Sequence, residues 1–158
     1  MLKKLRQRLK NERGLTLIEL LAVVVILGII AAIAIPSIGG LIDNSKKDAH
    51  VANAKQMISS AKLALAADET LRPVAGTPKT VTLQKLEDDG YIDTLKDPDG
   101  DSSDGDSENG KGYKRSSSLV TITAVGTDKF SYTVTLKGSK RGFTAKTQDQ
   151  LNRKAFDN

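Results

Sequence analysis

The chain has 158 residues, 39% of them hydrophobic and 4% aromatic, a length that suits one ordinary domain and excludes a large multidomain enzyme. It contains no cysteine and one histidine, His50, which excludes disulfides, thiolate chemistry and a multi-histidine metal centre within one chain. The net charge of +5 resides in residues 1–14, so the remainder is neutral overall and the chain is not a general binder of polyanions.

Residues 15–35 form the most apolar segment, in which Thr16 and Glu19 are the only polar side chains. At about 1.5 Å per residue, a helix of this length spans roughly 31 Å, about the thickness of a bilayer core. We therefore predict a membrane-spanning or secretion-signal helix, with basic residues 1–14 on the cytoplasmic side. A carboxylate at the membrane centre costs about 2.5 to 3.5 kcal/mol, so Glu19 needs either a partner or a shallow position among the headgroups.

Helical periodicity resumes after Pro36, a residue that removes one helical hydrogen bond and usually kinks or ends a helix. Within residues 37–67, apolar side chains recur at steps of three and four residues. They are Val51, Ala54, Ile58, Ala61 and Leu65. This amphipathic stripe predicts that the second part of the helix packs against a partner surface.

Residues 68–158 predict a small globular head. Thr82 is expected to cap a short helix that stops at Gly90, and residues 94–112 form a loop dense in Asp, Ser and Gly. Residues 117–147 alternate in three strand-like runs joined by hairpin-sized connections, and the polar tail from residue 148 to 158 is expected to fray. The sequence thus predicts an α+β fold, in which a long N-terminal helix, transmembrane then amphipathic, packs on a small antiparallel sheet.

The start of the apolar helix carries a specific signature. Gly14-Leu15-Thr16-Leu17-Ile18-Glu19, behind a short basic leader, resembles the class III signal of type IV pilins and pseudopilins, and the resemblance extends to Gly28 and Pro36. It implies that a prepilin peptidase removes residues 1–14, that the new amino group of Leu15 is methylated, and that the helices polymerise into a filament. It also implies that Glu19 neutralises the amino group of the same or a neighbouring subunit. Leu15 is a departure, since most members have phenylalanine there.

This resemblance implies a structural protein without catalytic residues. It is stored as a single-pass membrane protein and extracted into a bacterial surface filament, a homo-oligomer, with the help of an assembly ATPase and a platform protein. The alternative within the family is a pseudopilin of a type II secretion or competence system, the latter serving DNA uptake. A further alternative is cleavage after Ala32-Ile33-Ala34 by an ordinary signal peptidase, but the length of the apolar stretch and the charge of Glu19 argue against it.

Six carboxylates crowd residues 97–108. Four of them, Asp97, Asp99, Asp101 and Glu108, have the offsets one, three, five and twelve of an EF-hand calcium loop. Ser102 stands where such a loop requires glycine, and no clear helix flanks the segment. The region from residue 90 to 113 also resembles the connection of major pseudopilins and of many Gram-positive pilins, where the loop can hold calcium. Two interpretations remain open: a solvated, self-repelling loop, and a calcium site, as in a membrane-anchored calcium-binding module that does not polymerise.

Two other groups of residues carry side chains with possible chemistry. His50 is expected on the surface, because Ser45 and Asp48 do not share its helix face and no glycine-rich elbow surrounds the serine. A basic set would meet DNA if its members shared one face, although nearby acidic residues favour an ordinary soluble surface. Its members are Lys137, Lys140, Arg141, Lys146, Arg153 and Lys154.

Overall fold

The computed structural model describes residues 16–100 and 112–157. The chain comprises two compact units, residues 1–42 and 43–158, and each is described by itself. Helix α2 (Leu17–Ala67) begins in the first unit and ends in the second. Pro36 lies inside α2, so the proline does not end the helix. Because proline has no backbone N–H, the helix loses one hydrogen bond to the preceding turn at this position.

The first unit contributes an apolar stretch of α2 that is long enough to span a membrane. Sixteen large apolar side chains between Leu17 and Ile42 are each at least 46% exposed. Glycine and alanine fill most of the other positions. This part of the helix therefore presents apolar side chains on all of its faces, as expected for a helix surrounded by lipid or by other helices.

The second unit contains a four-stranded antiparallel sheet in the order β1-β2-β3-β4. The strands are β1 (Lys79–Thr82), β2 (Leu119–Gly126), β3 (Lys129–Lys137) and β4 (Gly142–Thr147). The three strands predicted from alternation are present. Strand β1 is additional to the prediction, in which Thr82 is only a helix cap. Thr82 in fact ends β1 and also caps α3 (Leu83–Asp88), where its Oγ1 accepts a hydrogen bond from the N–H of Lys85.

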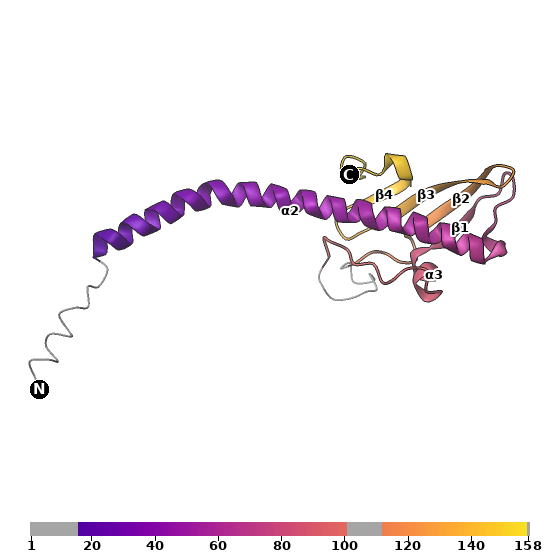
Figure 1. Ribbon diagram of the computed structural model, residues 1–158, viewed down its shortest axis with the longest axis horizontal. Helices are drawn as coiled ribbons and strands as arrows, with labels where there is room; N and C mark the ends of the chain where they lie inside the picture. Colours follow the sequence, from indigo (N-terminus) through magenta and orange to yellow (C-terminus); the bar gives the residue numbers. More distant parts are fainter. Residues whose placement is uncertain (1–15, 101–111, 158) are drawn as a thin grey trace, which may run out of the picture. The chain divides into compact units, whose positions relative to one another are not determined.

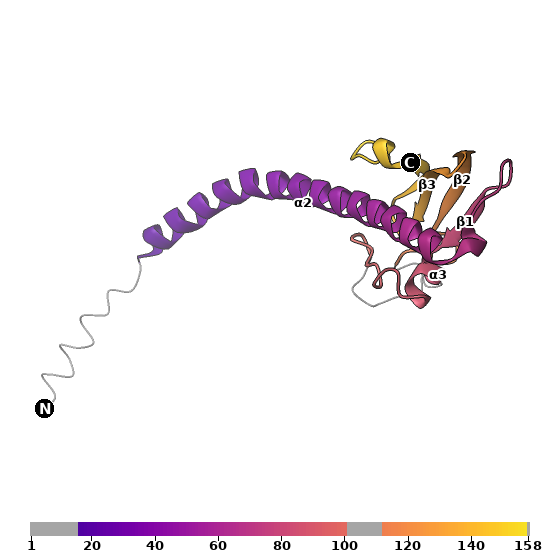
Figure 2. The same ribbon diagram turned by 45° about the vertical axis from the view of Figure 1, so that its right-hand side comes forward.

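The carboxyl-terminal part of α2 lies across one face of this sheet (Figures 1 and 2). The predicted stripe makes this contact: Ala54, Ile58 and Ala61 are fully buried, and Val51 and Leu65 are partly buried against the same core. The sheet contributes side chains that alternate along its strands, among them Val81, Val120, Ile122, Val134 and Leu136. The α+β prediction, with a long helix packed on a small antiparallel sheet, is confirmed.

The tail beyond β4 is ordered through residue 157, and the expectation that it frays is wrong. A short helix, η3 (Gln148–Gln150), leads to Leu151, which is buried in the core. The ring of Phe156 stacks on Phe143 with 4.4 Å between centroids, and the N–H of Asp157 donates to the carbonyl of Gly142. Three apolar side chains of this mostly polar segment, Leu151, Ala155 and Phe156, pack on the core and fix the tail there. A second short helix, η1 (Glu69–Leu71), follows α2.

Candidate functional site

The start of α2 is closed by a reciprocal pair of side chains, Thr16 and Glu19. The N–H and the hydroxyl of Thr16 both donate to Glu19 Oε2, at 2.8 and 2.9 Å, and the N–H of Glu19 lies 3.3 Å from Thr16 Oγ1. This is a capping box, which satisfies backbone N–H groups that a helix otherwise leaves without acceptors. The carboxylate also lies at the positive end of the helix dipole. Glu19 therefore has a partner within its own turn, which the sequence pattern Thr-x-x-Glu signals.

The other predicted processing and assembly residues differ in what the structure says of them. Gly14 and Leu15 lie outside the described residues. Gly28 lies inside α2, and a Cβ placed there would meet no atom within 4 Å. The described part of the chain therefore gives no internal packing reason for a glycine at this position. A close neighbour would have to come from another molecule or from lipid.

The comparison with protein families decides how this segment is interpreted. The model of the prokaryotic N-terminal methylation motif matches residues 9–35. The chain carries the amino-terminal methylation motif of type IV pilins and pseudopilins. No curated protein and no solved structure matches the chain. The match therefore covers only the amino-terminal segment, and the head has to be interpreted from its own residues.

The head contains a buried polar network centred on His50, which α2 supplies. His50 is fully buried, so the expectation of a surface histidine is wrong. Its Nδ1 lies 2.8 Å from the hydroxyl of Tyr113, and its Nε2 lies 3.2 Å from Asp99 Oδ2 and 3.4 Å from Asp97 Oδ1. Tyr113 also accepts a hydrogen bond of 3.0 Å from the amide of Asn53.

These contacts fit a neutral imidazole. The hydroxyl of Tyr113 donates to Nδ1 and the protonated Nε2 donates to the carboxylates, so each polar atom of the ring has a partner. Burial lowers the pKa of His50 below its usual 6.5, and outweighs the opposite effect of Asp97 and Asp99. Burial also raises the pKa of Tyr113 well above its usual value, which keeps the phenol protonated.

The two aspartates of this network are held from several sides. Arg141, in the turn between β3 and β4, pairs with Asp99 through Nε and with Asp43 at 2.8 Å. Lys46 lies 3.6 Å from Asp99. Burial raises the pKa of Asp99, but the hydrogen bond from His50 and the charge of Arg141 outweigh it, so the net pKa lies below the usual value. The segment 97–99 is thus fixed to α2 and to the β3–β4 turn.

Asp97 completes this attachment through backbone groups. Its carboxylate accepts hydrogen bonds from the N–H of Ser139 at 2.6 Å and of Asp99 at 2.9 Å. Asp101 and Glu108, the other two predicted calcium ligands, lie outside the described residues. The described oxygens already contact Arg141, His50, Lys46 and backbone N–H groups. A calcium ion at Asp97 and Asp99 would therefore have to displace these contacts.

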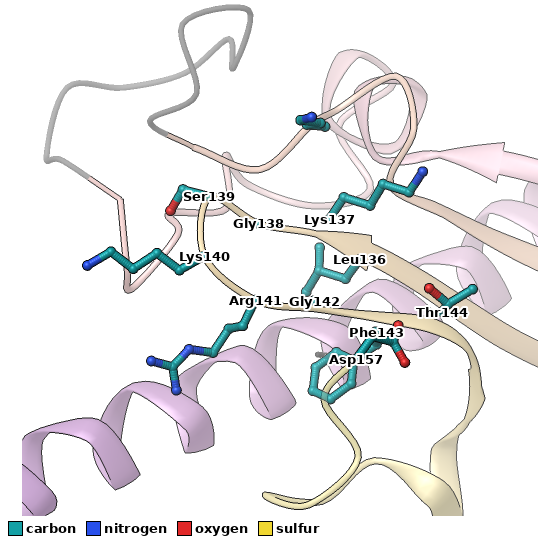
Figure 3. Close-up of a pocket in the computed structure, with 11 residues that line it drawn as sticks. Leu136, Lys137, Gly138, Ser139, Lys140, Arg141, Gly142, Phe143, Thr144 and Asp157 are labelled. Carbon is teal, nitrogen blue, oxygen red and sulfur yellow. The ribbon is translucent and has the colours of Figure 1, made fainter.

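The basic residues proposed for DNA do not gather on one uncompensated surface. Arg141 pairs with Asp43 and Asp99, Lys146 lies 3.6 Å from Asp157, and Arg153 pairs with Asp48. A shallow pocket at the β3–β4 turn is lined by further basic side chains (Figure 3). There, Lys137 and Lys140 point in opposite directions, and Arg141 points toward α2. The geometry does not form the continuous positive track that a phosphate backbone requires.

Proposed function

We propose that this chain is a structural subunit of a type IV pilus-like filament. In this proposal a prepilin peptidase removes residues 1–14, the amino group of Leu15 is methylated, and the subunits polymerise through the first half of α2. The observation that carries it is the combination, on one helix, of the methylation motif with sixteen exposed large apolar side chains. The role is structural, and the proposal assigns no catalytic residue.

The exposed side chains decide what environments this helix tolerates. Completing the burial of a half-exposed Leu, Ile or Val releases about 1 kcal/mol, so sixteen of them together amount to on the order of 15 kcal/mol. The free-energy cost of leaving this surface in water is therefore as large as the whole free energy of unfolding of an ordinary domain. A bilayer and a bundle of identical helices both remove the surface from water. The subunit can consequently be stored in the membrane and transferred to a filament core with little net loss of burial.

Glu19 gives this transfer its specificity. Cleavage after Gly14 creates a positive amino group at Leu15, next to the Thr16 that pairs with Glu19 in the capping box. An amino group entering an apolar core unpaired is strongly unfavourable, whereas one that meets a carboxylate is not. We propose that Glu19 accepts the amino group of a neighbouring subunit, and that Gly28, with its open surroundings, lets a neighbouring helix come close.

The motif is shared by pilins and pseudopilins, so the use of the filament is a separate question. Motility, adhesion, secretion and DNA uptake are separated by deleting the gene and scoring twitching, surface attachment, secretion and transformation. The proposed partners are other copies of the chain, the membrane, the prepilin peptidase, the assembly ATPase and the platform protein. The anchored calcium-binding module remains the competing function from another class, and it predicts that no filament forms.

The experiment that tests the proposal compares sheared surface material from cells expressing the wild type, Glu19→Gln and Glu12→Gln, by electron microscopy and immunoblotting. Glu12→Gln is the matched control, because it makes the same change in the leader that cleavage removes. We expect filaments in the wild type and in Glu12→Gln. In Glu19→Gln we expect processed subunits retained in the membrane. Normal filaments in Glu19→Gln, or none in the wild type, would contradict the proposal.

A further inference from the structure

The face of the sheet turned away from α2 is rich in threonine and serine. Lys62 of α2 lies over the ring of Tyr132, with 5.3 Å to its centroid, so Tyr132 faces the helix and its odd-numbered neighbours in β3 face away. In β2, Val120 and Ile122 are fully buried, so the threonines on either side of Ile122 also face away. Most of the positions that face away are threonine or serine, and the exceptions include Leu119 of β2 and the two end residues of β3, Lys129 and Lys137.

Strand register aligns these hydroxyl side chains into rows. Thr80 of β1 lies opposite Thr121 of β2, which lies opposite Thr133 of β3, which lies opposite Thr147 of β4. One row of threonines therefore crosses all four strands. We call the whole set the hydroxyl face. Its members are Thr80, Thr121, Thr123, Ser131, Thr133, Thr135 and Thr147. Neighbouring hydroxyls lie roughly 4.8 Å apart across the strands and about 6.8 Å apart along them.

Most of these hydroxyls have no partner among the residues that the structure describes. Within residues 16–100 and 112–157, the hydroxyls of five members form no hydrogen bond to another protein group. They are Thr80, Thr121, Thr123, Ser131 and Thr133. Between Lys129 and Lys137, the first and last residues of β3, this side of the strand carries no charged residue, although 27% of the residues in the chain are charged. An ordered array of free donors and acceptors without charge is therefore available to a ligand.

We propose that the hydroxyl face binds a flat, extended, uncharged polysaccharide. Each threonine hydroxyl both donates and accepts a hydrogen bond, as each sugar hydroxyl does, and the threonine methyl groups suit the C–H surface of a sugar ring. The absence of charge matches a neutral ligand and gives no attraction for DNA or an anionic lipid. The four-strand width of the row, roughly 14 Å, suits several sugar units of an extended chain better than a single sugar.

A second copy of the chain fits this face less well. Packing two hydroxyl faces together would bury donors and acceptors whose partners are not positioned for them, at a cost of about 1 to 3 kcal/mol for each group left unpaired. Threonine is also under-represented among the residues that dominate protein interfaces. Binding by one subunit is expected to be weak. Many copies of the face along a filament would raise the overall affinity. Only this increase rests on the proposed function; binding by a single subunit does not.

The experiment uses the full chain, solubilised as a monomer in detergent, in co-sedimentation with microcrystalline cellulose and with chitin. The test variant is Thr121→Val with Thr133→Val, which keeps the β-branched shape and removes two hydroxyls. Thr121→Ser with Thr133→Ser restores both hydroxyls. The matched control is Thr94→Val with Thr127→Val, which makes the same change at two exposed threonines outside the face.

We expect the wild type, the serine variant and the control to bind. The valine variant should lose at least about tenfold in apparent affinity, because two neutral hydrogen bonds are removed. An unchanged unfolding temperature of the valine variant would show that the loss is not a loss of folding. The proposal would be overturned if the wild type bound neither polysaccharide, or if the valine variant bound as tightly as the wild type. Loss of filaments in the valine variant without any polysaccharide binding would instead make the face a contact between subunits, and would also overturn it.

Discussion

Gly138 lies where the β3–β4 turn meets the polar network, and replacing it with alanine is the sharpest test of how tightly that network is built. A Cβ at this position would lie 2.6 Å from the carbonyl oxygen of Arg141, 2.9 Å from Asp97 Oδ2 and 3.3 Å from His50 Cε1. The first of these atoms belongs to the backbone and the other two to buried side chains, so the turn has to move. Overpacking of this kind costs about 2 to 3 kcal/mol.

The measurement is the unfolding temperature of the head in the detergent-solubilised chain, followed by circular dichroism in the near ultraviolet. A loss of 2 to 3 kcal/mol corresponds to a fall of about 10 °C for a domain of this size. Gly126→Ala is the matched control, because the nearest atoms to its Cβ lie at 3.8 and 3.9 Å, an ordinary contact distance. It should change the unfolding temperature by only a few degrees. If Gly138→Ala and Gly126→Ala behaved alike, the tight turn described here would be wrong.

Three further predictions concern the same head. Arg141→Gln leaves the buried carboxylate of Asp99 without its main cation, so the free energy of unfolding measured in urea should fall by about 2 to 4 kcal/mol. A fall of less than about 0.5 kcal/mol would contradict the described network. Because the pKa of His50 is lower in the folded chain, the unfolded chain binds a proton first as the pH falls below about 6.5. The free energy of unfolding should therefore decrease below this pH by up to about 1.4 kcal/mol per pH unit. His50→Gln should make the free energy of unfolding less dependent on pH in this range. The lowered pKa of Asp99 adds a second loss of stability, which begins below the usual pKa of an aspartate and continues until the pH has fallen through the folded pKa. Phe156→Ala should cost about 1 to 3 kcal/mol and speed amide hydrogen exchange in the tail, whereas unchanged exchange would refute the packed tail.

Periodic features of the sequence were sufficient to predict most of the fold. The helical stripe from Val51 to Leu65 and the alternation in β2 to β4 each repeat a pattern that one face of an element imposes. Strand β1 is only four residues long, too short for alternation to show, and its last residue also serves as a cap. The helix continues beyond Pro36 because a proline removes only one hydrogen bond, and the later turns keep their contacts with the core.

The site was harder to predict because its partners come from distant parts of the chain. His50 lies one helical turn before Ala54, on the buried stripe, and this spacing could have indicated burial. Its partners Asp99, Tyr113 and Arg141 are brought together only by the fold, so no local pattern connects them. In the tail, Phe156 was hidden by polar neighbours.

At the helix start, the capping box of Thr16 and Glu19 was present in the sequence as Thr-x-x-Glu. The pattern alone does not single out this role, because a carboxylate in an apolar segment also fits a headgroup contact or a pairing with the amino group of Leu15. The predicted roles of Gly14, Leu15, Glu19, Gly28 and Pro36 remain proposals that rest on the methylation motif.

The central claim is that this chain is processed and assembled as a pilin-like subunit, and the mass of the intact protein in surface material tests it most directly. Filaments sheared from cells and analysed by intact-mass spectrometry should contain a chain that begins at Leu15 and is heavier by one methyl group, which fragmentation should place on the amino-terminal nitrogen. A mature chain beginning at Ile35, or an uncut chain in the assembled material, would contradict the account.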